Sequence, residues 1–463
     1  MLKGIHNASV AKRLSLGVFL SVAPLALLWG LFPGHELEKA STSVKGVLRI
    51  VNENYVDADK ASYDKLAHYA LHGMVESLDP HSEFLESKDN KAFEEDLDGK
   101  FGGVGIEVEL HQGHLTIVAV TPNAPSDKVG LKRGDYISTI DGFSVEHTAK
   151  MQEAVERLRG KPKTDVAVSV FRPSLNKTLS FNITREIINV NSVIGEKVLD
   201  QNIGYLRITE FSDNTGEQFW KKLNALLEKN IQALVIDLRD NPGGLLDAAV
   251  EVAEPFFKKG DLIVYTQGRK PTDKEEFKSE TEGEALVMPV AILINEGSAS
   301  AAEIVTGALK DTGKAIVVGE RSFGKGSVQT IIKLASGEAL RLTTAHYYTP
   351  NGKLIHQKGV SPHVEVVLSA EDDAKINRQV SREDITDPKE FKEHFGFEPI
   401  QDTQLLTALD VLKGVQLYDL EKIIETEKGN LKTSSTGHKV FWMTKKSVHK
   451  HSEFSGIPLG KSA

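Results

Sequence analysis

The stretch Val290–Gln329, VAILINEGSASAAEIVTGALKDTGKAIVVGERSFGKGSVQ, carries the pattern that decides the fold. Its apolar run Val290–Ile294 predicts a strand that ends at an Asn-Glu-Gly turn. The spacing of Ala301–Leu309 predicts a helix, and Ala315–Val318 predicts a second strand, which leads to a glycine-flanked lysine, Lys325. Strand, helix and strand in this order indicate an α/β protein.

Ser300 stands where the first of these strands turns into the helix. A hydroxyl at such a turn is exposed and lies near the first backbone N–H groups of the helix, which can hold an anion. Ser300 and Glu303 also match the capping-box pattern, in which the serine only caps the helix. Lys325 alone is equally open to interpretation, because most lysines are solvated surface groups. The two residues by themselves leave both interpretations open.

The composition is that of an ordinary soluble globular protein, with 40% hydrophobic and 26% charged residues. A chain of 463 residues is long enough for two or three domains. The net charge of -9 argues against nucleic acid as a partner, because phosphate binding needs a basic surface. The chain has no cysteine, which excludes disulfides, thiolate zinc sites and a cysteine nucleophile.

Residues 1–35 have the layout of an export signal or membrane anchor. Lys3, Lys12 and Arg13 precede Leu16–Phe32, a run without charged residues. The run is slightly shorter than a typical span of about 20 residues, and no clean Ala-x-Ala cleavage site precedes Pro33. We expect an uncleaved anchor in the inner membrane rather than a cleaved signal, which would place the rest of the chain in the periplasm.

Residues 36–97 predict a helical element that packs or dimerises, with a break at Leu78–Ser82. Residues 98–185 then combine a glycine loop, a β-branched strand, a small-residue helix and Gly-Asp turns, and they resemble a PDZ domain. In such a domain the loop amides hold a peptide's terminal carboxylate while the peptide adds a strand to the sheet edge. A phosphate-cradling loop is the rival, but no P-loop or GxGxxG pattern is present. The loop residues are Gly103, Val104, Gly105 and Ile106.

Residues 186–370 alternate between strand and helix patterns with buried, near-continuous apolar strands, as in an α/β core. A charged segment, Gln267–Gly283, is predicted to be a loop that overhangs a cleft. Residues 371–428 predict a C-terminal helical segment, and 429–463 a flexible basic tail. The predicted strands are Ile203–Ile208 and Ala233–Leu238, the helices Gly216–Lys229, Leu245–Phe257 and Asp402–Leu412, and the hairpin Val328–Leu334 with Ala339–His346.

Together, these pieces resemble the carboxy-terminal processing, or tail-specific, proteases over roughly Val44–Lys413. The resemblance implies a ClpP/crotonase-like α/β protease core with an inserted PDZ domain, a serine–lysine dyad, and no metal or organic cofactor. It implies protein substrates that are unfolded or expose their tails, a possible regulatory or adaptor protein, and leaves a homo-oligomer open. The motifs that carry it are Leu78–Ser82, Phe101–Gly105, Asp237–Gly244, Gly297–Glu303 and Gly324–Gln329.

The resemblance assigns a role to each residue of the expected site. The nucleophile falls on Ser300, the second serine of Ser-Ala-Ser, and Ser298 remains the minor alternative. The general base falls on Lys325 and the glutamine that orients it on Gln329. The oxyanion hole falls on the backbone N–H groups of Gly243 and Ala301, and Gly244 can take the place of Gly243.

The chemistry requires a neutral lysine, because only a neutral amine can take the serine proton. Burial must therefore lower the lysine pKa from its usual value of about 10.4. Two rivals stay open. A serine–histidine–aspartate triad would recruit His346 or His356 with Asp240. A catalytically inactive PDZ scaffold of the cell envelope would bind peptides without cutting them.

Overall fold

The computed structural model describes residues 33–111, 113–121, 123–145, 151–382 and 385–433. At its centre is a six-stranded sheet with the order β10-β11-β12-β15-β16-β19. Its strands pair in parallel from β11 to β19, and β10 is antiparallel to β11. The strands are β10 (Val193–Leu199), β11 (Ile203–Ile208), β12 (Ala233–Asp237), β15 (Val290–Ile294), β16 (Ile316–Gly319) and β19 (Val364–Glu365).

Both faces of this sheet are covered, which explains why its strands read as continuous apolar runs. Every residue of β11, β12 and β15 is buried. One face packs against α7, α8 and α9, and the other packs against α12 through Leu293, Ala408 and Leu412. The α/β class and the predicted core strands are therefore confirmed. The helices are α7 (Thr215–Glu228), α8 (Leu246–Ala253), α9 (Ala301–Asp311) and α12 (Thr403–Thr433), with the 3-10 turn η5 (Glu254–Phe256) after α8.

A second, antiparallel sheet has the order β1-β18-β13-β14, and β17 also pairs with β18. The predicted hairpin is confirmed as β17 and β18. The prediction of a loop over Gln267–Gly283 was wrong, because this segment contains β14, which pairs with β13. Phe277 packs against the core while its charged neighbours face solvent, as is common for an edge strand. The strands are β1 (Glu83–Leu85), β13 (Leu262–Gly268), β14 (Lys274–Lys278), β17 (Ser327–Lys333) and β18 (Ala339–Tyr348).

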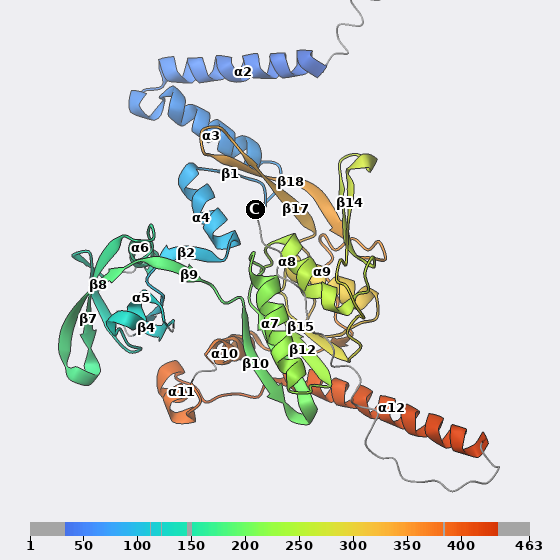
Figure 1. Cartoon of the computed structure of the whole chain (residues 1–463). Coiled ribbons are helices and arrows are strands. Elements are labelled where there is room, and N and C mark those ends of the chain that lie inside the picture. Colours follow the sequence, from blue (N-terminus) through green and yellow to red (C-terminus); the bar gives the residue numbers. More distant parts are fainter. Residues whose placement is uncertain (1–32, 112, 122, 146–150, 383–384, 434–463) are drawn as a thin grey trace, which may run out of the picture.

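The N-terminal segment is mostly helical, as predicted, but it also contributes β1 to the second sheet. Glu83–Leu85 pairs antiparallel with Ala339–Arg341 of β18, a contact between distant parts of the chain that local periodicity does not reveal. This pairing brings the Leu78–Ser82 turn beside the second sheet (Figure 1). The other elements of the segment are α2 (Pro33–Asn54), η2 (Ala58–Lys60), α3 (Tyr63–Glu76) and α4 (Ser87–Leu97).

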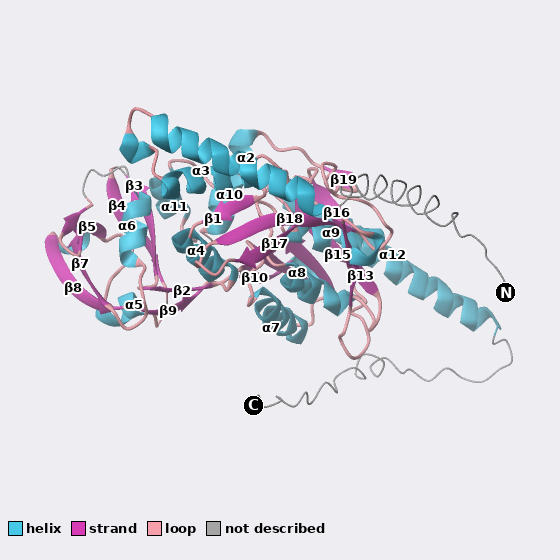
Figure 2. Ribbon diagram, turned by 90° about the horizontal axis from the view of Figure 1, so that it is seen from above, coloured by secondary structure: helices cyan, strands magenta, loops and turns pink. Residues whose placement is uncertain are grey.

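The expected PDZ segment forms a separate sheet with the order β3-β4-β5-β7-β8, to which β6 is added. It lies at one end of the molecule and joins the core through the paired strands β2 and β9 (Figure 2). The hydrophobic core of this PDZ unit is made of apolar residues from β4, β5, β7 and β8 and from the helix α6. The elements are β2 (Lys100–Gly103), β3 (Ile106–His111), β4 (His114–Val120), α5 (Pro125–Val129), β5 (Tyr136–Ile140), β6 (Phe143–Ser144), α6 (Met151–Leu158), β7 (Asp165–Arg172), β8 (Lys177–Thr184) and β9 (Glu186–Asn189).

The C-terminal segment is helical, as predicted, and ends in α12, which projects from the body (Figure 1). Helix α12 continues to Thr433, past residue 429 at which the tail was expected to begin, and residues 434–463 lie outside the described residues. The predicted anchor Leu16–Phe32 also lies outside them, and among the helices described none is long and apolar enough to cross a bilayer. The remaining elements are α10 (Ala370–Ser381), α11 (Pro388–Phe395), η3 (Pro173–Leu175), η4 (Asp200–Asn202) and η6 (Pro271–Asp273).

Candidate active site

Ser300 lies at the N-terminus of α9, directly after the turn that ends β15. Its φ of 53° is uncommon for a residue with a side chain, so the turn holds the serine in a strained conformation. The Ser298 hydroxyl is fully buried and donates to the Leu238 carbonyl at 2.8 Å, whereas Ser300 is partly exposed. The geometry therefore favours Ser300 over Ser298 as the nucleophile.

Glu303 connects the Ser300 turn with the Lys325 turn. Its fully buried carboxylate accepts the backbone N–H of Ser300 at 2.9 Å and that of Lys325 at 2.8 Å. It also accepts the Gly324 N–H at 2.8 Å and the Ser322 hydroxyl at 2.6 Å. Burial raises the pKa of Glu303, and these hydrogen bonds oppose the shift. The capping box is present, but its glutamate also positions a second, distant turn.

Lys325 precedes β17 in a turn that only glycines can form. Gly324 has a φ of 95°, and a Cβ at Gly326 would lie 2.3 Å from the His356 backbone nitrogen. Burial lowers the pKa of Lys325, the positive charge of Arg341 lowers it further, and Glu303 opposes both. Within the described part of the chain no carboxylate forms an ion pair with its amine. The lysine thus has the environment that favours a neutral amine.

Tyr347 lies between the two turns and is fully buried on β18. Its hydroxyl donates to the Lys325 carbonyl oxygen and is in hydrogen-bond contact with the Ser300 side chain. Burial raises the pKa of Tyr347 well above 10, so the phenol stays neutral. A neutral phenol can orient the serine hydroxyl without adding charge beside the lysine.

Gln329 lies on β17, opposite Thr343 of β18. Its amide nitrogen donates to the Ser327 hydroxyl at 2.9 Å and to the Thr343 hydroxyl at 3.2 Å. Among the described residues it makes no hydrogen bond to Lys325. The structure therefore places Gln329 on the strand that follows the lysine, with its amide engaged by two hydroxyls.

The Leu78–Ser82 turn brings a histidine close to Lys325. Asp79 accepts hydrogen bonds from the backbone of His81 and from the Ser82 hydroxyl, and it also binds Thr343 on β18. Burial lowers the pKa of His81, and the positive charge of Lys325 lowers it further. The turn therefore contributes a weakly basic imidazole to the surroundings of the lysine.

The histidines of the rival triad lie near Lys325 but away from the proposed aspartate. The rings of His346 and His356 are 4.7 Å apart, and His346 contacts the Gly326 carbonyl. Asp240 instead binds the side chain of Asn295 at 2.9 Å and pairs with Arg207 at 3.7 Å. Within the described residues, no histidine–aspartate pair of the kind that a triad needs is formed here.

The Asn-Pro-Gly-Gly turn packs directly against Ser300. A Cβ at Gly243 would lie 2.6 Å from the Ser300 Cβ and 2.9 Å from the Ala301 nitrogen, so only glycine fits. The Gly243 N–H donates to the Asn241 side chain at 2.8 Å. Among the described groups, the N–H groups of Ala301 and Gly244 have no such partner. The N–H groups of Ala301 and Gly244 are thus not engaged, whereas that of Gly243 is held by Asn241.

The expected carboxylate loop lies at the open edge of the PDZ sheet. Gly103 ends β2 and Ile106 begins β3, and Val104 and Gly105 form the turn between them. Gly105 has a φ of 76°, and a Cβ there would lie 2.3 Å from the Ala124 side chain. Strand β3 is at the edge of its sheet, where a peptide can add a strand.

Comparisons with known proteins match both parts of the molecule. The model of peptidase family S41 matches residues 202–366, and that of a PDZ domain matches residues 102–184. The carboxy-terminal-processing protease of Bartonella bacilliformis is 38% identical over 356 residues, which cover 76% of this chain and 81% of the relative. The carboxy-terminal processing protease CtpB of Bacillus subtilis is 33% identical over 414 residues, which cover 87% of this chain and 85% of the relative.

The chain belongs to the carboxy-terminal processing proteases of family S41. It is a serine peptidase with a PDZ domain. Among solved structures, the photosystem II D1 C-terminal processing protease is 27% identical, with a TM-score of 0.39 and coverage of 70% of this chain and 92% of that one. Ser300, Lys325 and Gln329 all lie within the part of the carboxy-terminal processing protease that the S41 model matches.

Three residues near the candidate site of this carboxy-terminal processing protease were missed as site residues. Glu303 was interpreted only as a cap, and Tyr347 and His81 were not singled out. Each one reaches the site through a contact between segments that are distant in sequence, so no local pattern could have assigned its role. The quoted Leu78–Ser82 motif was the one available signal for His81.

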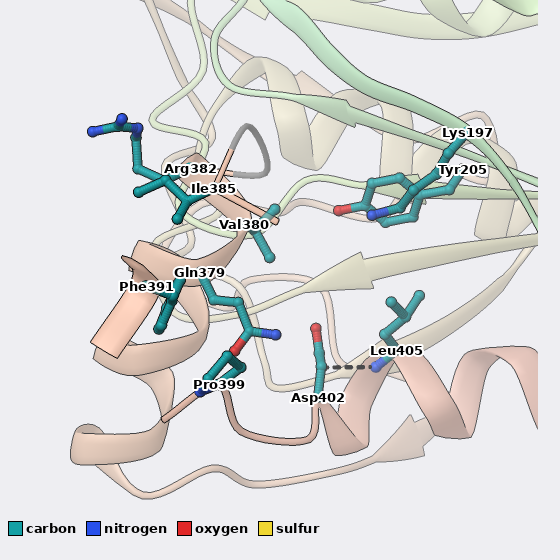
Figure 3. A pocket seen from close by; sticks show the side chains of 10 residues that line it. All are labelled: Lys197, Tyr205, Gln379, Val380, Arg382, Ile385, Phe391, Pro399, Asp402 and Leu405. Atoms are coloured by element: carbon teal, nitrogen blue, oxygen red, sulfur yellow. Dashed lines mark hydrogen bonds between the residues drawn. The ribbon is translucent and has the colours of Figure 1, made fainter. Parts of the chain in front are cut away.

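A pocket of about 380 Å³ lies on another part of this carboxy-terminal processing protease, and none of the predicted site residues lines it. Figure 3 shows Lys197 and Tyr205 on one side of it and Asp402 at the start of α12 on another. The Tyr205 hydroxyl donates to Asp237 at 2.8 Å, and Arg239 bridges Asp237 and Asp402. Asp237 and Arg239 of the Asp237–Gly244 motif therefore hold the C-terminal helix against the sheet.

Proposed function

We propose that this peptidase cuts protein substrates upstream of an exposed apolar C-terminus by a serine–lysine dyad mechanism. The observation that carries the proposal is the buried Glu303 carboxylate, which binds the backbone of both Ser300 and Lys325. One buried side chain thus holds the turn of a strained serine and the turn of a lysine with a lowered pKa. This arrangement matches the requirements of an activated nucleophile and its base.

In the proposed reaction, neutral Lys325 accepts the Ser300 proton while the serine oxygen attacks the scissile carbonyl. The lysine then donates this proton to the leaving amine, and water releases the acyl-enzyme by the reverse sequence. Tyr347 orients the serine hydroxyl, and Gln329 fixes the strand that follows the lysine through Thr343. No step of this sequence requires a cofactor.

The developing oxyanion is held by backbone N–H groups at the start of α9 and in the Asn-Pro-Gly-Gly turn. Ala301 supplies the first N–H, where the helix dipole also favours negative charge. Gly244 supplies the second in the conformation described, and Gly243 does so once its hydrogen bond to Asn241 is broken. Such a rearrangement would make the oxyanion hole complete only when substrate is in place.

The PDZ domain supports the choice of a C-terminal tail as the recognised feature. The turn at Val104 and Gly105 offers backbone N–H groups to a carboxylate, and the free edge of β3 offers a strand partner. A tail that reaches from this edge to Ser300 must be unfolded. We therefore propose unfolded or tail-exposed proteins as substrates.

We also propose that the enzyme works outside the cytoplasm, in a periplasm, held by its N-terminal segment in the inner membrane. The support is the charge pattern of Lys3, Lys12 and Arg13 before the uncharged run Leu16–Phe32. Fractionation of cells that produce the whole chain would test this. Recovery in the cytosolic fraction would contradict it.

The test of the dyad uses residues 36–463 and an unfolded protein with an apolar tail, with fragments followed by mass spectrometry. Ser300→Ala and Lys325→Ala should each abolish cleavage while leaving substrate binding intact. Ser336→Ala and Lys333→Ala are the matched controls, because both side chains are on the exposed β17–β18 hairpin. Full-rate cleavage by Lys325→Ala would refute the dyad, and binding without cleavage by the unmodified enzyme would favour the scaffold.

Carboxylate capture is tested with two forms of one substrate, which end in a free acid or an amide. The amide should be cut more slowly, because it lacks the charge that the loop amides hold. Gly105→Ala should reduce this difference, since its added methyl group meets Ala124. Gly113→Ala is the control, because its Cβ meets nothing within 4 Å and its φ of 83° is similar. Equal rates for acid and amide would count against capture.

A further inference from the structure

Two histidines and a glutamate from neighbouring elements form a compact cluster outside the catalytic site. His68 and His72 are one helical turn apart on α3, and Glu86 follows β1. One nitrogen or oxygen from each residue lies within 4.8 Å of the others, and no other such group of three occurs in the described part of the chain. Both imidazole rings pack edge-on against the buried Phe84, which fixes their orientation.

The hydrogen bonds of His72 leave one ring nitrogen ready to bind a cation. Its Nδ1 lies 3.1 Å from a carboxylate oxygen of Glu76, to which it can donate a proton. Its Nε2 is buried and has no hydrogen-bond partner, so in this tautomer it presents a bare lone pair. A carboxylate behind an imidazole is the usual arrangement in metal sites, where it fixes the tautomer and raises the basicity of the ligand.

The spacing of the other two ligand atoms also fits a metal. His68 Nε2 and Glu86 Oε1 are 3.2 Å apart. The edge of a tetrahedron with metal–ligand bonds of 2.0–2.1 Å is about 3.3 Å, so this pair needs almost no movement. The ligand atoms of all three residues lie within 4.8 Å of one another, and the exposed side chain of Glu86 has room to adjust.

We propose that His68, His72 and Glu86 bind a divalent transition-metal ion, Zn²⁺ being the best match, with Glu76 as the carboxylate behind His72. Two imidazoles and a carboxylate are a ligand set that suits Zn²⁺, and a water completes the tetrahedron from the solvent side. The ligands flank the Leu78–Ser82 turn, with His72 before it and Glu86 after it. A bound ion would therefore clamp both ends of the turn that carries His81 and that Asp79 ties to Thr343 of β18.

The test measures the binding of metal ions to the whole chain and does not depend on peptidase activity. Addition of Zn²⁺ should give one tight binding event by calorimetry and slow amide hydrogen exchange over residues 68–86. Co²⁺ in its place should give the intense visible bands of a tetrahedral site. His72→Gln and Glu86→Gln should each remove this binding event and the Co²⁺ bands. The control His114→Gln, an exposed histidine of the PDZ sheet, should change neither.

The role of Glu76 gives a second, graded readout. Glu76→Gln should weaken Zn²⁺ binding by roughly 10- to 100-fold without removing a ligand, as for other residues behind a metal ligand. Retention of full binding in His72→Gln would overturn the proposal and point to histidines elsewhere, such as His346 with His356 or those beyond residue 433. Absence of any saturable binding to the unmodified chain would overturn it as well, leaving His68 and Glu86 as a metal-free ion pair.

Discussion

The Glu303 carboxylate accepts the backbone N–H of Lys325 at 2.8 Å, although the two residues belong to different turns. The same oxygen accepts the Ser300 N–H, so the proposed nucleophile and its proposed base are placed by a single buried group. The position of the lysine relative to the serine therefore depends on a residue that need not touch the substrate.

Replacing Glu303 by glutamine should impair both folding and catalysis. The amide group of glutamine would face N–H donors that now bind a carboxylate oxygen, leaving buried donors unpaired. We expect a loss of about 1 to 3 kcal/mol in the free energy of unfolding, and a fall of roughly 10- to 100-fold in kcat from misplacement of the lysine. Chemical denaturation and kcat measurements check this, with Glu296→Gln, an exposed residue of the turn that precedes α9, as the control. Unchanged kcat in Glu303→Gln would contradict the positioning role.

Arg341→Gln should shift the pH dependence of kcat/KM. Burial lowers the pKa of Lys325 most, and the positive charge of Arg341 lowers it further. Activity should rise with pH as the lysine loses its proton. Without the Arg341 charge the lysine pKa rises, so the rising limb moves to higher pH. Arg341→Lys keeps the charge and should leave the limb close to its original position. A limb that stays in place in Arg341→Gln would mean that Lys325 is not the titrating base.

Gly243→Ala should abolish cleavage in a folded enzyme. Its added methyl group would lie 2.6 Å from the Ser300 Cβ and 2.9 Å from the Ala301 nitrogen, which closes the space for the oxyanion. Loss of one oxyanion donor costs about 10²- to 10³-fold in kcat, and we expect at least this effect. Gly260→Ala is the matched control, because its φ of 86° is also positive and its Cβ meets nothing within 4 Å. Comparable kcat values for the two variants would refute the assignment.

The Asp237–Arg239 pair should make the protein sensitive to acid. Burial alone would raise the pKa of Asp237, but the charge and hydrogen bonds of Arg239 lower it to about 2. Because the folded-state pKa is below the unfolded value of about 3.9, this carboxylate stabilises the fold fully above that pH. The stabilisation, on the order of 2 kcal/mol, should be lost as the pH falls from about 4 toward 2.

Thermal denaturation between neutral and acidic pH tests this sign. Asp237→Asn should lower Tm at neutral pH, because it leaves the buried Arg239 with fewer partners. Its Tm should then fall less steeply on acidification than that of the unmodified chain. Asp64→Asn, an exposed residue of α3, should follow the unmodified chain at every pH. Parallel curves for Asp237→Asn and the unmodified chain would contradict the assignment.

The core strands and the Ser300 turn were predictable because their signals are local. Val290–Ile294 is apolar throughout since the strand is covered on both faces, and the small residues after it permit the tight turn. The contacts that build the site are not local. Tyr347 contacts Lys325 from β18, and Glu303 contacts it from α9. Because these segments are distant in sequence, no periodic pattern along the chain could predict either contact. The charged strand β14 was missed for a related reason, because its pairing with β13 outweighs its low strand propensity.

The strands β2 and β9 bring the entrance and the exit of the PDZ domain side by side, with Lys100 opposite Asn189. A domain whose two chain ends are adjacent can be removed or exchanged, because a short linker can close the gap that its removal leaves. The central six-stranded sheet begins only at β10, after the paired strands β2 and β9. If the PDZ domain selects substrates as proposed, replacing it with another peptide-binding module would change which tails are cut and leave the core intact. The pairing of β2 with β9 would therefore let the proposed recognition domain be exchanged by recombination without changing the peptidase core.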